Sequence, residues 1–184
     1  SPAPFVWIDP EGTGRNTHAY FRREFELDGP ADLAELHIYA HDRYLLYVNG
    51  TCIDYGPPRT YNHRPEYDTY DIRPWLQAGA NCIAVHVAHW GVDNFHTRPG
   101  PGALAAWGTV HVADGERLCL STASGWRAHK AGGFDPLAPK YSFAQPCIHV
   151  QDAREDVQGW NLPDTDCSDW DTAVKLDDQD AFGP

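Results

Sequence analysis

Apolar and polar residues alternate along short stretches of this chain, and the longest such block runs from residue 34 to residue 90. Its first stretch, AELHIYAH, has the period of two that is typical of a half-buried β-strand. The apolar face of this strand is expected to carry Leu33, Leu36, Ile38 and Ala40. A second stretch, YLLYV, leads into Asn49-Gly50, a dipeptide that tolerates positive φ and predicts a type I′ hairpin turn.

Further short strands are predicted on both sides of this block. They cover residues 5–8, 20–27, 67–72, 82–89, 105–112 and 118–120, with another beginning near residue 124. The stretch YFRREFEL alternates aromatic and charged residues, which places Arg22 on a polar face. Asp71 is expected to cap a short helical turn that contains Pro74. With many Gly and Pro breaks and no clear amphipathic helix, the pattern predicts one all-β domain, a β-sandwich, over residues 1–184.

The formal charge of −12 argues against two classes of partner. Nucleic acid and anionic membranes both require clustered Lys or Arg, so neither is expected to bind. Acidic residues concentrate near the end of the chain, where Trp160 and Trp170 are expected to pack back on the body. The chain has no methionine and begins at Ser1, so we expect an excised domain or a processed product.

The five cysteines are widely spaced and form no CxxC pair, which argues against a zinc ribbon or a dense disulfide scaffold. Cys82 and Cys119 lie within predicted strands and are expected to be small core residues, while one disulfide stays open. Among the ten histidines, His86 and His89 fall on opposite faces of one strand. Without a third convergent ligand, the sequence does not predict a zinc site.

A series of short motifs follows one another along the chain. They are YFRR from Tyr20, DRY from Asp42 with VNG from Val48, GPPR from Gly56, YDTYDI from Tyr67, DAR from Asp152 and DW from Asp169. In this order they resemble the N-terminal β-sandwich module of bacterial α-L-rhamnosidases, glycoside hydrolase family 78, over roughly residues 7–174. Sandwiches of family 2 glycosidases share part of the pattern. The resemblance implies a jelly-roll β-sandwich of the galactose-binding type.

The resemblance also implies that catalysis takes place in a separate domain of a longer enzyme. In that family these modules precede a large helical barrel that carries the catalytic acid and base, and 184 residues cannot hold such a barrel. We therefore predict no catalytic residues in this chain and expect its parent to be an α-L-rhamnosidase-like glycosidase. No signal peptide or long apolar run is visible, so localisation stays open between the bacterial cytoplasm and secretion.

The loop GVDNFHTRPGPG, residues 91–102, is the predicted ligand site, because loops of this length in compact domains are commonly functional. The candidate ligand-binding residues are Trp90, Asp93, Asn94, His96 and Arg98, with Arg59, Tyr61 and His63 from the loop that follows the hairpin. Trp90, Tyr61 and Tyr55 are candidates for stacking on a sugar ring, with simple packing as the alternative for each.

Asp93 and Asn94 are also the candidate metal ligands. Their side chains offer the hard oxygens that Ca2+ prefers. Some rhamnose-binding modules similar to this one hold the sugar through Ca2+ bridged by adjacent Asp and Asn, and the open alternative is an Asx turn. The resulting expectation is a module that binds a plant-type oligosaccharide or rhamnoside. A structural module that packs on the catalytic domain of the same polypeptide, without binding sugar, is the alternative.

Overall fold

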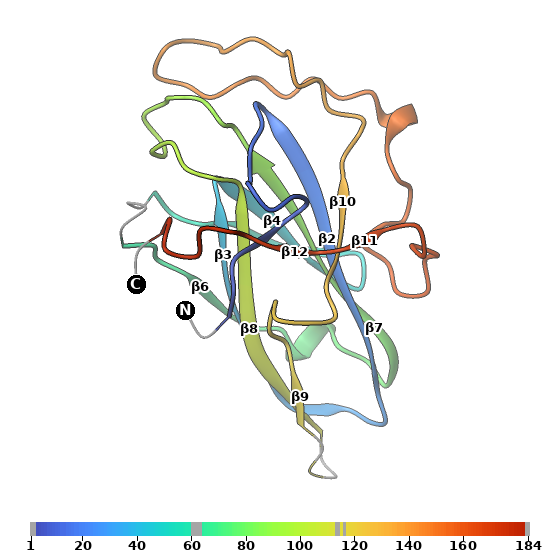
Figure 1. The fold of residues 1–184 in the computed structure, drawn as a ribbon. Coiled ribbons are helices and arrows are strands. Elements are labelled where there is room, and N and C mark those ends of the chain that lie inside the picture. The colour runs from blue at the N-terminus through green and yellow to red at the C-terminus, as the bar shows by residue number, and fades with distance from the viewer. Residues whose placement is uncertain (1–2, 60–63, 113–114, 116, 183–184) are drawn as a thin grey trace.

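The computed structural model describes residues 3–59, 64–112, 115 and 117–182, which form two antiparallel sheets packed face to face (Figure 1). The predicted all-β jelly-roll sandwich is confirmed. Within the described residues, no helix is long and apolar enough to cross a membrane.

The first sheet has the strand order β12-β1-β8-β3-β6, with β9 paired to β8. Its strands are β1 (Val6–Trp7), β3 (Ala31–His41), β6 (Asp68–Asp71), β8 (Ala103–Val112), β9 (Arg117–Cys119) and β12 (Val174–Lys175). The second sheet has the order β11-β10-β2-β7-β4-β5. Its strands are β2 (Thr17–Leu27), β4 (Arg43–Val48), β5 (Thr51–Gly56), β7 (Gly79–His89), β10 (Arg127–Lys130) and β11 (Asp171–Thr172). The 3-10 helices are η1 (Arg73–Trp75) and η2 (Ala153–Glu155).

The turn between β4 and β5 is the predicted type I′ hairpin, since Asn49 and Gly50 both have positive φ, 49° and 81°. Asn49 also binds the neighbouring strand. Its Oδ1 accepts the backbone N–H of Cys82 at 2.8 Å, and its Nδ2 donates to Asn81 Oδ1 at 2.9 Å. The predicted cap near Pro74 is present one position later than expected. Ile72 is the N-cap of η1, and the Asp71 carboxylate accepts the N–H of Arg73.

The core lies between the two sheets, where the apolar faces of the strands meet. Its fully buried side chains include Trp7, Phe21, Leu36, Ile38, Leu46, Ile83 and Leu104. The prediction that Leu33 lies on the apolar face of its strand is wrong, because Leu33 is exposed. The pairing with β8 is continuous from Leu33 to His41, so strict alternation places Ala34, and not Leu33, on the same inward face as Leu36, Ile38 and Ala40.

The outer face of the second sheet is covered by residues 131–170, here called the covering segment. In Figure 1 this orange to red chain leaves β10, arches over the top of the sandwich and descends on the right. It brings Trp160 and Trp170 against Tyr20 of β2, at ring-centroid distances of 4.1 Å and 6.4 Å. The expectation that both tryptophans pack back on the body is confirmed.

The prediction for Arg22 also needs correction. Arg22 lies on the polar face of its strand, but that face is not exposed to water. The side chain is 1% exposed. Its guanidinium donates to the carbonyl oxygens of Leu162 at 3.0 Å and Thr165 at 3.2 Å, and it pairs with Glu24. A buried arginine therefore fastens the covering segment to β2.

The cysteines differ in part from expectation. Cys82 is buried as predicted, whereas Cys119 is exposed at the end of the short strand β9. All five cysteines lie within the described part of the chain, and none forms a disulfide there.

Candidate functional site

A groove of about 590 Å³ opens between the outer face of the second sheet and the covering segment. We call it the outer groove. Its floor comes from β2, β4, β5 and β7, and its wall from the covering segment. The lining residues are Tyr20, Arg43, Tyr44, Leu45, Tyr47, Tyr55, His86, Ala88, Phe134, His149, Gln151, Asp156 and Trp160.

Aromatic rings dominate the outer groove. Trp160 stacks on Tyr20 with an interplanar angle of 15° and meets the Tyr47 ring edge-on, at 5.3 Å and 76°. Tyr55 projects from β5 with 73% of its surface exposed. Because stacking and packing hold Trp160 in one orientation, the rings present a fixed apolar surface beside polar groups.

The polar group at the centre of the outer groove is the carboxylate of Asp156. Both of its oxygens lie 2.8 Å from the Tyr20 hydroxyl, which donates to it, and Gln151 Nε2 donates to Oδ2 at 2.7 Å. Burial, together with the hydrogen bond to Asp156, raises the pKa of Tyr20. Tyr20 therefore remains a neutral donor, and it fixes the carboxylate in place.

A histidine cluster lies beneath the outer groove. His18 Nδ1 and His86 Nε2 are 2.9 Å apart, and the His149 ring meets the His18 ring edge-on at 4.6 Å. Phe134 stacks on the other side of His18, at 3.8 Å. Burial, followed by the neighbouring histidines, lowers the pKa of His18 to about 2 and that of His86 to about 4. Both rings are therefore neutral at pH 7.

Several predicted ligand residues meet elsewhere, in a smaller cavity of about 310 Å³ that we call the loop pocket. It is lined by Arg59, Asn94, Phe95, His96, Thr97, Arg98 and Pro99. Arg59 thus lies beside the loop of residues 91–102, and its role in ligand binding stays a prediction. Tyr61 and His63 lie outside the described residues. Trp90 is only 6% exposed and packs against His96, so its ring face is not available to a sugar in this conformation.

Of the two predicted Ca2+ ligands, the side-chain oxygen of Asn94 is engaged in other contacts. Asn94 Oδ1 accepts the backbone N–H groups of His96 at 2.7 Å and Thr97 at 3.0 Å, which is the pattern of an Asx turn. Asp93 is exposed, and its backbone carbonyl accepts a hydrogen bond from Lys140. Because the Asn94 oxygen already has two donors, the pair fits Ca2+ poorly. Calcium binding at Asp93 and Asn94 stays a prediction.

Sequence analysis missed the outer groove for a physical reason. Tyr20 and His86 pair across β2 and β7, and that register cannot be deduced from either strand alone. Trp160 lies in an irregular segment far along the chain. Its aromatic side chain within an acidic stretch predicted packing on the body, but not a position in this groove.

Comparison with known proteins places this fold in a family. Residues 30–181 match the family model described as the α-L-rhamnosidase N-terminal domain. A curated α-L-rhamnosidase of Streptomyces avermitilis is 31% identical over 173 residues, covering 86% of this chain and 16% of that protein. The GH78 rhamnosidase of Bacillus sp. GL1 superposes with a TM-score of 0.85 and 36% identity, over 96% of this chain and 18% of its own. The chain thus spans less than a fifth of either rhamnosidase.

A lectin has a similar fold. The Pleurotus ostreatus lectin, solved in complex with GalNAc, superposes with a TM-score of 0.63 over 97% of this chain and 42% of its own. At 21% identity, this likeness concerns the fold alone.

Proposed function

The chain belongs to the family of α-L-rhamnosidase N-terminal domains, and from this premise we propose that it is a non-catalytic module that binds carbohydrate in the outer groove. The observation that carries the proposal is the half-buried Trp160 ring, which stacks on the buried Tyr20 beside the Asp156 carboxylate. A sugar has an apolar face of C–H groups and a rim of hydroxyls. It therefore needs an aromatic surface next to hydrogen-bonding groups.

The size and chemistry of the outer groove support this assignment. Ligand sites for small molecules are concave, largely apolar and roughly 300 to 1,000 Å³ in volume, with a few convergent polar groups. The outer groove has about 590 Å³ and offers the side chains of Gln151, His86 and Arg43 around its aromatic surface. Neutral His86 can either donate or accept a hydrogen bond, which suits sugar hydroxyls.

L-Rhamnose is the first ligand to propose. A solved Streptomyces avermitilis α-L-rhamnosidase is complexed with L-rhamnose, and the lectin of similar fold binds GalNAc. L-Rhamnose carries a methyl group in place of a primary hydroxyl, and Phe134 and Tyr47 provide apolar surface for such a group. GalNAc serves as the comparison sugar, and rhamnose-containing plant oligosaccharides as longer probes.

Replacing Trp160 is expected to weaken sugar binding at least about 5-fold, since truncation of one anchoring aromatic costs more than about 1 kcal/mol. Titration calorimetry of the wild type and Trp160→Ala with L-rhamnose measures this. A second variant, Gln151→Ala, tests the polar side of the groove with less risk to folding, because Gln151 is exposed. The matched control is His96→Ala in the loop pocket, which is expected to bind as the wild type does.

The same titrations, repeated with EDTA and with added Ca2+, test the calcium prediction. The opposite result would be loss of binding in His96→Ala and in the presence of EDTA, with binding by Trp160→Ala unchanged. It would indicate that the sugar binds in the loop pocket, at Asp93 and Asn94. No heat with L-rhamnose, GalNAc or the oligosaccharides would contradict carbohydrate binding altogether.

A second candidate function rests on an exposed apolar cluster. Tyr141 and Phe143 in the covering segment are 82% and 78% exposed, and Phe95 packs edge-on against Phe143 at 5.4 Å. Leu137 on the same segment is also exposed. Grouped apolar side chains of this kind often mark a contact with another domain. The corresponding proposal is that this cluster packs on the catalytic domain of the same polypeptide.

Disrupting this cluster is expected to release the module from its catalytic domain. The two parts of a longer polypeptide that carries this domain can be produced as separate chains and mixed. We expect co-elution in size-exclusion chromatography with the wild type and separate peaks with the double variant Tyr141→Ser/Phe143→Ser. The control Leu33→Ser removes an exposed leucine of the first sheet and is expected to leave co-elution intact. Separate peaks with the wild type would argue against docking.

A further inference from the structure

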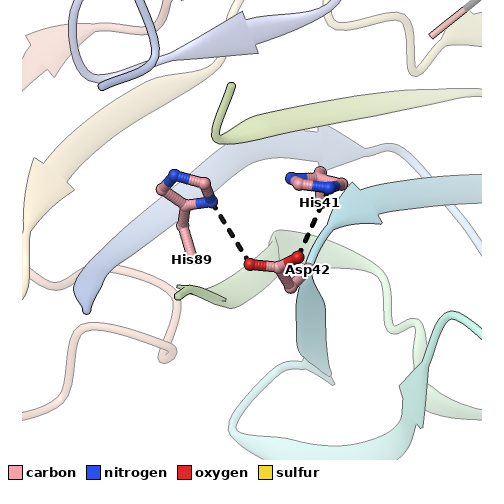
Figure 2. A group of neighbouring side chains, drawn as sticks. All are labelled: His41, Asp42 and His89. Atoms are coloured by element: carbon pink, nitrogen blue, oxygen red, sulfur yellow. Dashed lines mark ion pairs between the residues drawn. The ribbon is translucent and has the colours of Figure 1, made fainter. Parts of the chain in front are cut away.

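Three buried side chains meet where β3 passes into β4 and where β7 ends. They are His41, Asp42 and His89 (Figure 2). Figure 2 shows the two imidazole rings on either side of the carboxylate, with one carboxylate oxygen directed to each ring. We propose that this trio is a binding site for a divalent transition-metal ion of the Zn2+ type.

Two distances within the trio, each from one imidazole to one oxygen of Asp42, match the spacing of neighbouring ligands around one ion. His41 Nε2 lies 3.3 Å from Asp42 Oδ1, and His89 Nδ1 lies 3.4 Å from Asp42 Oδ2. The ligand atoms of all three residues lie within 4.8 Å of one another. Ligands bound tetrahedrally at about 2.0 to 2.2 Å from Zn2+ are separated by roughly 3.3 to 3.5 Å. Two imidazoles with one carboxylate suit Zn2+ and its neighbours, whereas Ca2+ prefers oxygen alone.

An unpartnered atom supports the same assignment. His89 is 2% exposed, and its Nδ1 has only a long contact to Asp42 Oδ2, at 3.4 Å, in place of a well-formed hydrogen bond within the described residues. Buried polar atoms almost always have a partner, so an orphaned one requires an explanation. A metal ion between His89 and Asp42 would supply that partner.

The surroundings hold the carboxylate and offer a further ligand. The backbone N–H of Trp90 donates to Asp42 Oδ2 at 2.7 Å, and the Thr97 hydroxyl donates to Oδ1. Hydrogen bonds of this kind orient metal-binding carboxylates. The carbonyl oxygen of Arg98 lies 2.9 Å from His41 Nε2, close enough to complete a fourfold shell.

Metal binding requires a proton to move within His41. In the metal-free protein, His41 Nε2 donates its hydrogen to the Arg98 carbonyl. As a ligand, Nε2 must offer a lone pair, so the proton passes to Nδ1, which has no partner among the described residues.

The ion would join three separate segments: the β3–β4 junction, the end of β7, and the loop of residues 91–102. Thr97 and Arg98 of that loop contact Asp42 and His41 and also line the loop pocket. The bound ion would then hold in place the loop of residues 91–102, which is the predicted ligand site. The histidine ligands could not be identified from the pattern of hydrophobic residues.

The test uses untagged protein, stripped with a chelator and dialysed against Zn2+, followed by measurement of bound metal. We expect one zinc ion per chain and a rise in melting temperature of roughly 5 to 10 °C at a Zn2+ concentration about 100-fold above Kd. Co2+ in place of Zn2+ is expected to give the visible absorption of a four-coordinate site with nitrogen ligands.

Two neighbouring histidines of β7 provide the variant and its control. His89→Gln is expected to lose the bound zinc and the thermal shift. His86→Gln, on the same strand but facing the outer groove, is expected to keep both. If His89→Gln does not fold, His41→Gln and the Co2+ spectrum of the wild type decide the matter. A wild type without zinc after dialysis, or a folded His89→Gln that retains it, would overturn the proposal.

Discussion

Lowering the pH from 7 to 4 is expected to reduce the free energy of unfolding by several kcal/mol, because His18 and His86 are held neutral beneath the outer groove. In the unfolded chain both histidines titrate near the ordinary pKa of 6.5, whereas in the folded protein their pKa values fall to about 2 and about 4. Below pH 6.5 the unfolded state therefore binds protons that the folded state does not, and acid favours unfolding.

The pH window follows from these values. Each histidine contributes a slope of about 1.4 kcal/mol per pH unit wherever only the unfolded state is protonated. Both contribute between about pH 6.5 and 4, and His18 alone continues towards pH 2. Burial also lowers the pKa of His149, which adds a loss of the same sign. The stability conferred by these groups is fully present above pH 7.

Urea unfolding followed by tryptophan fluorescence at pH 7, 5.5 and 4 measures this dependence. The double variant His18→Gln/His86→Gln is expected to have a flatter profile, whatever its stability at pH 7. A free energy of unfolding that stays level between pH 6.5 and 5 in the wild type would show that the histidines titrate normally in the folded state.

Replacing Arg22 by alanine is expected to destabilise the protein by about 2 to 4 kcal/mol, because a hydrogen bond to a charged group contributes about 1.5 to 3 kcal/mol and more than one is lost. The lost stability should affect one part of the structure more than the rest. The carbonyl oxygens of Leu162 and Thr165 would lose their donor, and Glu24 would lose its ion-pair partner. The covering segment should therefore loosen first, and the wall of the outer groove with it.

Hydrogen exchange separates this outcome from general unfolding. In Arg22→Ala we expect faster exchange across residues 157–170 than in the β3–β8 pair of the first sheet. Arg22→Lys keeps the charge but not the planar fork, so it should be intermediate. Glu24→Gln, at the half-exposed end of the pair, should cost less than about 1 kcal/mol. A stability of Arg22→Ala within 1 kcal/mol of wild type would contradict this role for Arg22.

Most of the strands were predictable because alternation records which face of a strand is buried. The Asn49-Gly50 turn was predictable as well, because its backbone conformation depends on those two residues. The errors at Leu33 and Arg22 have different causes. Strict alternation already places Leu33 on the face opposite Leu36, whereas Arg22 is buried by a covering segment whose position depends on tertiary structure.

The candidate sites were predictable only in part, for a related reason. The loop pocket could be anticipated because long polar loops stand out in the sequence, and Arg59 does meet that loop. The sequence did not show which histidines lie close to one another in the fold. His41 and Asp42 meet His89 because β4 pairs with β7, and His18 meets His86 because β2 pairs with β7 on its other side. Each pairing is set by the whole sandwich.

The pairing of β1 with β12 has a mechanical consequence. These terminal strands are antiparallel and joined through only two residue pairs, Val6 with Lys175 and Trp7 with Val174. Because Val6 pairs with Lys175, the start of β1 and the end of β12 lie at the same end of the pair. Tension between two flanking domains would therefore load these contacts one after another, like a zipper, rather than all at once in shear. The terminal strands would peel from the edge of the first sheet before its longer strand pairs separate, leaving the second sheet and the outer groove intact.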